Sequence, residues 1–214
     1  SLFVDDENLS RKKANIIKNE TNRLLNGLGM SLPCYVLVTK MDVISGFREY
    51  FSNVSDEIKS TELGYKSKDH FYDEMEFSNF WQDFIHKLRL GRNGLLLRHD
   101  ITKDEFNRLD EASKIYMFAE NVNELSTNLE IYFEIIFSDK KSSLNSSLLF
   151  EGLYFTSAKD GGYSLNKHFA KLHNKSIDEA PVSEELMQRQ GFFIDRLFKY
   201  QIFKDLKLAT FTPK

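Results

Sequence analysis

Two short apolar runs, separated by a long and mainly polar interval, constrain the fold of this chain most strongly. The first run is residues 32–39 and the second is residues 148–156. Nearly continuous apolar runs of this length are typical of strands that are covered on both faces, as in parallel sheets. Helical patterns precede the first run and fill much of the interval. The order of elements therefore predicts an α/β fold that is rich in helix.

The composition supports long helices and excludes several classes of protein. The 214 residues include only 10 Gly and 3 Pro, which is too few for the many turns of an all-β sandwich or barrel. A net charge of -3 argues against a generally basic nucleic-acid-binding surface. Cys34 is the single cysteine, so an internal disulfide and a Cys-rich zinc site are excluded. No apolar run approaches the roughly 20 residues that a membrane-spanning helix needs.

The helical patterns can be placed along the chain. Residues 9–28 form an amphipathic pattern that ends at two glycines, and residues 69–90 form a second pattern that we expect Gly91 and Gly94 to stop. Residues 102–105 have the sequence of a capping box, which begins a further helix. Apolar side chains then recur at alternating spacings of three and four: Ile115, Phe118, Val122, Leu125, Leu129, Tyr132 and Ile136. We interpret this seam as an internal helical hairpin, with an intermolecular coiled coil as the alternative.

Polar residues with a specific pattern follow the first apolar run. They form the tetrad Thr39-Lys40-Met41-Asp42. Guanine-nucleotide-binding folds have an Asn/Thr-Lys-x-Asp element at this place, because the carboxylate accepts hydrogen bonds from guanine N1–H and from the exocyclic amine. The Lys stem covers the base plane, and the Asn or Thr joins the adjoining loops. The tetrad alone is a weak pattern, but the carboxyl end of a parallel strand is where α/β folds bind ligands.

A second pattern follows the second apolar run. It reads Thr156-Ser157-Ala158-Lys159, and nucleotide-binding folds place a Ser-Ala-Lys loop here, whose backbone N–H meets guanine O6. Together the two loops predict a base-reading site formed by Thr39, Lys40, Asp42, Ser157, Ala158 and Lys159. The alternative is that both are ordinary strand-ending loops rich in small polar residues.

The chain lacks the other half of a nucleotide site. It contains no Gly-x-x-x-x-Gly-Lys-Ser/Thr loop, which would cradle phosphates and hold Mg²⁺. Phosphate contacts supply most of the affinity for a nucleotide, so we expect the chain alone to bind GTP poorly or not at all. We therefore assign it no catalytic residue and no cofactor, and whether it is part of an enzyme stays open.

Other chemistry-bearing residues have simpler interpretations. His70 lies among Asp69, Asp73 and Glu74, and we interpret this group as a solvated helix face rather than a metal site. Cys34 begins a buried strand with no His nearby, which favours a packed thiol over a nucleophile.

The segment 191–203 is too apolar for a solvated helix, so we expect it to pack on the body of the protein or on a partner. Its candidate partner-binding residues are Phe192, Phe193, Leu197, Phe198, Ile202 and Phe203.

Three of these segments resemble one known family. Residues 32–51, LPCYVLVTKMDVISGFREYF, are similar to the LPVYVLVTKCDLLxGFxEYF segment of IcmF/TssM proteins. Residues 152–158, GLYFTSA, resemble that family's RGVYFTSA element, and residues 192–203 resemble its YFLRDLFxxVIF helix. The three matches occur in family order, and they do not extend over residues 55–144.

The resemblance implies a fold and a place in a longer protein. IcmF/TssM proteins are large inner-membrane components of type VI secretion systems, with relatives in type IVB systems. The implied fold is the C-terminal half of a P-loop GTPase-like parallel sheet, with a core of residues 1–44 and 148–173. A mainly helical insertion would occupy residues 45–147, and a helical extension residues 174–214. The chain does not begin with Met, so we expect a segment of a longer protein. The resemblance implies that this segment belongs to a cytoplasmic domain whose phosphate loop lies upstream of Ser1.

The resemblance also implies partners and a location. GTP and Mg²⁺ would be cofactors of the longer protein only. The implied partners are other membrane-complex and baseplate subunits, DotU/TssL-like, at the cytoplasmic face of a bacterial inner membrane. The membrane itself would be crossed by other segments of the longer protein. We favour a structural and interaction module for this chain, and a guanine-nucleotide switch is the alternative.

Overall fold

The computed structural model describes residues 2, 4–52, 54–97, 105–137, 148–157, 191–194, 196–203 and 210–211. The helices are α1 (Glu7–Leu28), the 3₁₀ turn η1 (Met41–Val43), α2 (Phe47–Phe51), α3 (Asp56–Lys59), α4 (Glu74–Leu97), α5 (Glu105–Asn123), α6 (Ser126–Phe137) and the π-helical turn η3 (Leu197–Ile202). The strands are β1 (Met30–Val38), β2 (Leu63–Lys66), β3 (Leu148–Phe155) and β4 (Thr210–Phe211). The predicted helix-rich α/β class is confirmed.

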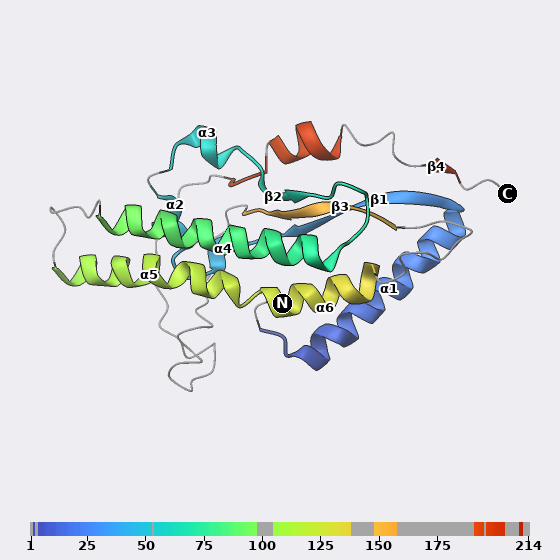
Figure 1. Cartoon of the computed structure of the whole chain (residues 1–214), viewed down its shortest axis with the longest axis horizontal. Helices are drawn as coiled ribbons and strands as arrows, with labels where there is room; N and C mark the ends of the chain where they lie inside the picture. Colours follow the sequence, from blue (N-terminus) through green and yellow to red (C-terminus); the bar gives the residue numbers. More distant parts are fainter. Residues whose placement is uncertain are drawn as a thin grey trace.

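The sheet is small and mixed. Its strand order is β2-β3-β1-β4 (Figure 1). The two strands predicted from the apolar runs do pair in parallel, with Cys34 opposite Phe150 and Val38 opposite Phe155. However, β2 pairs with β3 in the antiparallel direction, and the two-residue β4 does the same with β1. The prediction of an all-parallel sheet is therefore wrong for both edge strands, β2 and β4.

Burial differs between the two central strands. β3 is buried from Phe150 onward, as predicted, but β1 is only half-buried until Val38. In the described part of the chain, β4 pairs with β1 only at Met30 and Ser31, so most of β1 has a neighbouring strand on one side. The prediction that both strands are covered on both faces is therefore wrong for β1.

Helix α1 ends where the sequence predicts and begins two residues earlier than predicted, at Glu7. The Asp6 carboxylate accepts a hydrogen bond from the Leu9 N–H at 2.7 Å and caps the first turn. Gly29 ends the helix with a φ of 62°, a left-handed conformation that glycine adopts without strain. α1 packs along α6, where the Ser10 hydroxyl donates to Asn128 Oδ1 at 2.9 Å.

Helix α4 differs from its prediction at both ends. It begins at Glu74, because the Asp73 carboxylate accepts the Glu76 N–H at 2.9 Å and caps the helix. It also continues through both glycines that we expected to stop it. At Gly91 a Cβ atom would collide with the Tyr50 hydroxyl, which donates to the Leu88 carbonyl at 2.9 Å. Gly91 therefore admits a neighbouring side chain rather than ending the helix.

The predicted helical seam is an internal one. α4 and α5 lie side by side as an antiparallel hairpin, and α6 continues beyond α5 (Figure 1). The Trp81 indole N–H donates to Asn123 Oδ1 at 3.1 Å, and Arg89 pairs with Glu120 at 2.7 Å across the hairpin. The first five seam positions, from Ile115 to Leu129, are buried. Tyr132 and Ile136 are half-buried.

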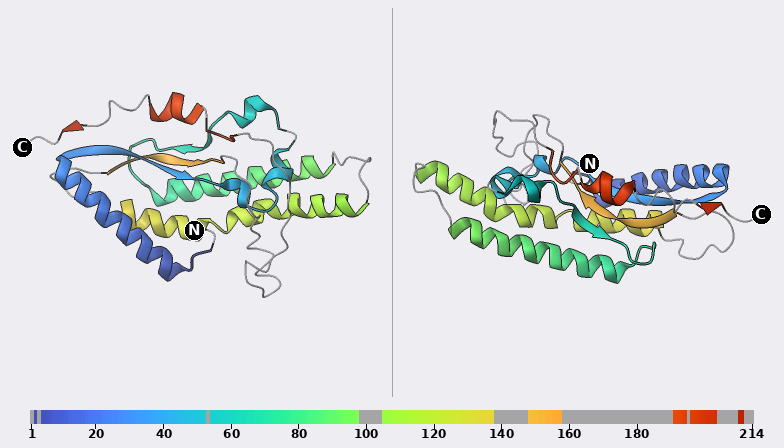
Figure 2. Two further views of the ribbon diagram at one scale, coloured as in Figure 1. Left: turned by 180° about the vertical axis from the view of Figure 1, so that it is seen from behind. Right: turned by 90° about the horizontal axis from the view of Figure 1, so that it is seen from above.

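Aromatic side chains join this helical layer to one face of the sheet. The Phe155 ring stacks on Phe84 with 5.0 Å between centroids, and the Phe150 ring meets Phe133 edge-on at 5.4 Å. η3 lies on the opposite side of the sheet, as Figures 1 and 2 show. No helix in the described ranges is long and apolar enough to cross a membrane.

Several expectations lie outside the described residues. They concern Ala158 and Lys159, the start of the capping box at residues 102–104, and the parts of the implied core and helical extension at residues 160–173 and 174–190.

Candidate functional site at the ends of the parallel strands

The carboxyl ends of β1 and β3 hold the two loops with nucleotide-site patterns side by side. The Thr156 N–H donates to the Val38 carbonyl at 2.8 Å, and the Met41 N–H donates to the Thr156 carbonyl at 3.2 Å. Lys40 turns the chain with a φ of 60°, which is uncommon for a residue with a side chain. Parallel pairing therefore brings together two loops that are more than a hundred residues apart in sequence.

Asp42 and Ser157 form a direct contact between these loops. The Ser157 hydroxyl donates a hydrogen bond to Asp42 Oδ1. Asp42 is 8% exposed and Ser157 is 1% exposed, whereas Thr39 and Lys40 are at the surface. A buried carboxylate needs hydrogen-bond donors to offset its lost hydration, and Ser157 supplies one.

The apolar segment near the C-terminus joins the same site. The Phe192 N–H donates to the Ser157 carbonyl at 2.7 Å, and the Ser157 N–H donates to the Phe192 carbonyl at 3.1 Å. The Phe193 N–H donates to the Lys59 carbonyl at 2.6 Å, so the segment is also held beside α3. In the sequence this segment and the Ser157 loop are separate features with no shared pattern. No local pattern reveals their pairing, because it links residues 35 positions apart through backbone atoms alone.

The candidate partner-binding residues separate into two groups. Phe193 is 2% exposed and Leu197 is fully buried, and the half-buried Phe192 packs its ring edge-on to Phe47 at 5.3 Å between centroids. In contrast, Phe198 and Phe203 are exposed and touch each other at 5.9 Å between ring centroids. Ile202, the remaining candidate, is half-buried. The inner residues anchor the segment, and the outer aromatic rings face solvent.

The chemistry available to the Asp42–Ser157 pair is hydrogen-bond acceptance. An ionised carboxylate has two oxygens with about four acceptor positions, and Ser157 uses one of them. Asp42 therefore retains acceptor capacity toward two N–H donors, which is the requirement for reading a guanine edge. At 8% exposure, Asp42 presents little of this capacity at the surface.

The acidic and histidine residues before α4 have a different arrangement from the expected solvated helix face. His70 lies outside the helix with a φ of 61°, and its Nδ1 is 2.7 Å from Oε1 of the fully buried Glu151 on β3. That prediction is therefore wrong, because the chain turns at His70 to reach the sheet. The described residues contain no cluster of three or more His, Cys, Asp or Glu that could hold a metal ion.

Cys34 is half-buried on β1. Burial, reinforced by the negative charge of Glu151, raises the pKa of its thiol to about 11. A thiol with so high a pKa is rarely ionised near neutrality, so it is a poor nucleophile.

The chain is a helix-rich α/β protein in which two polar loops lie at the ends of paired parallel strands. The chain belongs to the family of IcmF-related N-terminal domains, whose model matches residues 1–214. It is also similar to the type VI secretion system component TssM1 of Pseudomonas aeruginosa, with 25% identity over 210 residues. That match covers 94% of this chain and 18% of the relative, so the chain spans about a fifth of the relative's length. No solved structure matches the chain.

Proposed function

We propose that this chain is a structural and interaction segment in the cytoplasmic domain of a secretion-system membrane-complex protein. Its family membership and its similarity to a component of a type VI secretion system support this role. Its partners on this proposal are other membrane-complex and baseplate subunits of DotU/TssL type. The site of assembly would be the cytoplasmic face of the bacterial inner membrane, with transmembrane helices supplied by the longer protein.

The two-sided packing of the segment from Phe192 to Phe203 carries this proposal. Its inner residues are held by backbone hydrogen bonds to Ser157 and by the aromatic core. Its outer residues, Phe198, Tyr200 and Phe203, remain at the surface although they are large and aromatic. Aromatic residues exposed on an ordered anchor are typical of protein–protein contact sites.

The experiment is capture of a DotU/TssL-type subunit by the longer protein in detergent-solubilised membranes. The Phe198→Ser/Phe203→Ser double variant should reduce capture about tenfold or more, as expected when hot-spot aromatic residues are removed. Leu24→Ser/Leu28→Ser is the matched control, because it changes two exposed apolar residues on α1. Unchanged capture by the Phe198/Phe203 variant would refute this contact surface.

The hydrogen bond between Asp42 and Ser157 favours a second candidate function, a guanine-nucleotide switch in the longer protein. It brings together the two loops that this function requires and leaves acceptor capacity on Asp42. GTP and Mg²⁺ would then be bound with the help of a phosphate loop outside this chain. We rank this function second because Asp42 is buried and already has a hydrogen-bond donor.

Calorimetry with GTP and XTP in the presence of Mg²⁺ tests the switch in the longer protein. Asp42→Asn should weaken GTP binding relative to XTP by about 1.5–3 kcal/mol, because xanthine presents groups complementary to an amide. Asp56→Asn on α3 is the control for the change in charge. Absence of any guanine-nucleotide binding by the unmodified longer protein would refute this function.

A further inference from the structure

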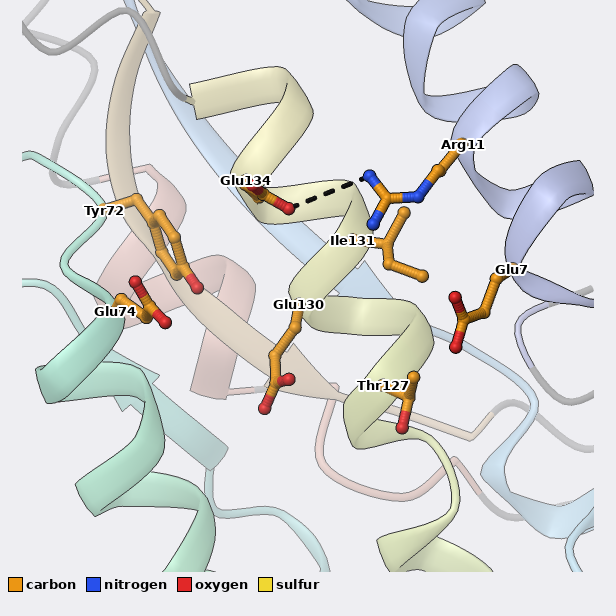
Figure 3. A pocket seen from close by; sticks show the side chains of 8 residues that line it. All are labelled: Glu7, Arg11, Tyr72, Glu74, Thr127, Glu130, Ile131 and Glu134. Atoms are coloured by element: carbon orange, nitrogen blue, oxygen red, sulfur yellow. Dashed lines mark ion pairs between the residues drawn. The ribbon is translucent and has the colours of Figure 1, made fainter.

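An acidic pocket lies between α1, α6 and the beginning of α4, away from the strand-end site (Figure 3). Its volume is about 300 Å³. Glu7 and Arg11 line it from α1, and Glu130 and Glu134 line it from α6. Glu74 lines it from the first turn of α4, and Tyr72 from the residues just before that helix. The pocket therefore presents four carboxylates and one guanidinium from three separate elements.

The carboxylates in this pocket are poorly neutralised. Arg11 reaches Glu134 only at 4.0 Å, and both side chains are largely exposed. Within the described ranges, no side-chain partner is present for Glu7, Glu74 or Glu130. Burial raises the pKa of Glu130, and the negative charge of Glu74 raises it further. The folded chain thus holds several like charges around one cavity, although their mutual repulsion opposes folding.

Tyr72 provides an independent indication of a ligand. Its side chain is 6% exposed, and Figure 3 shows its hydroxyl turned toward the space that Glu74 and Glu130 also face. No hydrogen-bond partner for this hydroxyl is present among the described residues. Burial and the neighbouring carboxylates, Glu130 first among them, raise the pKa of Tyr72, so the hydroxyl keeps its proton. The Tyr72 ring is buried, but its hydroxyl oxygen is open to the acidic pocket, so a ligand in the pocket can reach it.

We propose that this pocket binds an organic cation, an alkylammonium or guanidinium group. Such a group has several N–H donors that can be shared by carboxylates on different elements, and its charge relieves their repulsion. The Tyr72 hydroxyl accepts one further donor from the cation. A volume of about 300 Å³ suits one basic side chain or a short polyamine. The carboxylates do not gather into a metal-binding group in the described part of the chain, which favours a ligand with distributed donors.

This cation has two sources, a basic side chain of a partner protein or a free polyamine. Calorimetric titration of the full chain distinguishes them with two probes, the peptide Gly-Gly-Arg-Gly-Gly and spermidine. Saturable binding of both probes supports the shared chemistry. Binding of the peptide alone assigns the pocket to a partner's side chain, and binding of spermidine alone assigns it to a polyamine.

Variants locate the binding within the pocket. Glu130→Gln and Glu74→Gln should each weaken binding about fivefold or more, and Tyr72→Phe about two- to threefold, because each removes a charge or an acceptor. Glu57→Gln is the matched control, because it removes the same charge from an exposed position on α3. Circular dichroism confirms that each variant is folded. Failure of both probes to bind saturably, or equal weakening by Glu57→Gln, would overturn the proposal.

Discussion

Asp42 at the strand ends and Glu130 in the acidic pocket are both carboxylates on ordered elements, but their surroundings differ. Asp42 is buried and accepts a hydrogen bond from Ser157, whose backbone is in turn paired with Phe192. Glu130 shares its cavity with other carboxylates, and burial and Glu74 raise its pKa. The strand-end carboxylate completes a contact within the chain, whereas the four pocket carboxylates share one guanidinium, that of Arg11, among the residues that the structure describes.

The largest expected effect tests whether core packing holds the strand-end site together. Phe193→Ala should lower the free energy of unfolding by about 3–5 kcal/mol, because it leaves a cavity beside Phe51 where the segment is anchored. Phe203→Ala is the matched control and should change stability by no more than about 0.5 kcal/mol, because Phe203 is 58% exposed. Urea unfolding followed by circular dichroism measures both. Equal effects would contradict the division of this segment into inner and outer residues.

A smaller effect is expected from the polar contact itself. Asp42→Ala should lower the free energy of unfolding by about 1–3 kcal/mol, because it leaves the buried Ser157 hydroxyl without its acceptor. A double-mutant cycle with Ser157→Ala should give a coupling energy of about 0.5–3 kcal/mol. Strictly additive single effects would show that the two side chains do not interact in solution.

Tyr50 and Tyr72 allow a comparison of a hydroxyl that has a hydrogen-bond partner with one that has none among the described residues. Tyr50→Phe should lower the free energy of unfolding by about 0.5–1.5 kcal/mol, because its hydroxyl donates to Leu88 at 2.9 Å. Tyr72→Phe should have almost no effect, within about 0.5 kcal/mol, because no partner for its hydroxyl is described. Thermal or urea unfolding at neutral pH separates the two cases. A loss for Tyr72→Phe as large as that for Tyr50→Phe would remove the reason for expecting a ligand.

The smallest expected effect depends on pH. The pKa of Glu130 is raised in the folded chain, so its charged form destabilises the fold. This penalty is absent when the pH is below 4.5, the ordinary pKa of a glutamate side chain. It grows as the pH rises through the raised pKa of Glu130. Glu130→Gln should therefore increase stability at pH 7 by about 0.2–1 kcal/mol and leave it unchanged in acid.

Urea titrations of Glu130→Gln and of the unmodified chain at several pH values measure this difference. Glu57→Gln is the control and should give no gain, because Glu57 lies in the first turn of α3, where a negative charge is favourable. A gain that is independent of pH would contradict the assignment of the penalty to the charge of Glu130.

Local patterns predicted the main elements of this fold. The apolar runs correctly identified β1 and β3 and their parallel pairing, and the spacing of apolar residues identified α1 and the hairpin of α4 with α5. The same patterns gave wrong predictions where a residue contacts another residue that is distant in sequence. Gly91 lies within α4 because it makes room for Tyr50, and His70 leaves the helical pattern to reach Glu151. β2 was missed because four residues are too few to show a period.

The candidate site was predictable in part. The sequence placed Asp42 and Ser157 after two strands, and parallel pairing was enough to expect them close together. It did not reveal that Phe192 pairs with Ser157, because backbone hydrogen bonds leave no signature in side-chain patterns. The acidic pocket was also missed, since its residues come from three elements whose spacing in sequence is unrelated.

The sequence by itself determined the long helices, the two central strands and the polar loops that end those strands. The reason is that periodicity and strand-ending residues act over a few positions. Only the tertiary structure decided which carboxylate has a donor and which has none within the described part of the chain. Hydrogen bonding and burial depend on side chains that are brought together from distant segments. For this chain, that difference separates Asp42 as part of the framework from Glu130 as part of a proposed binding site.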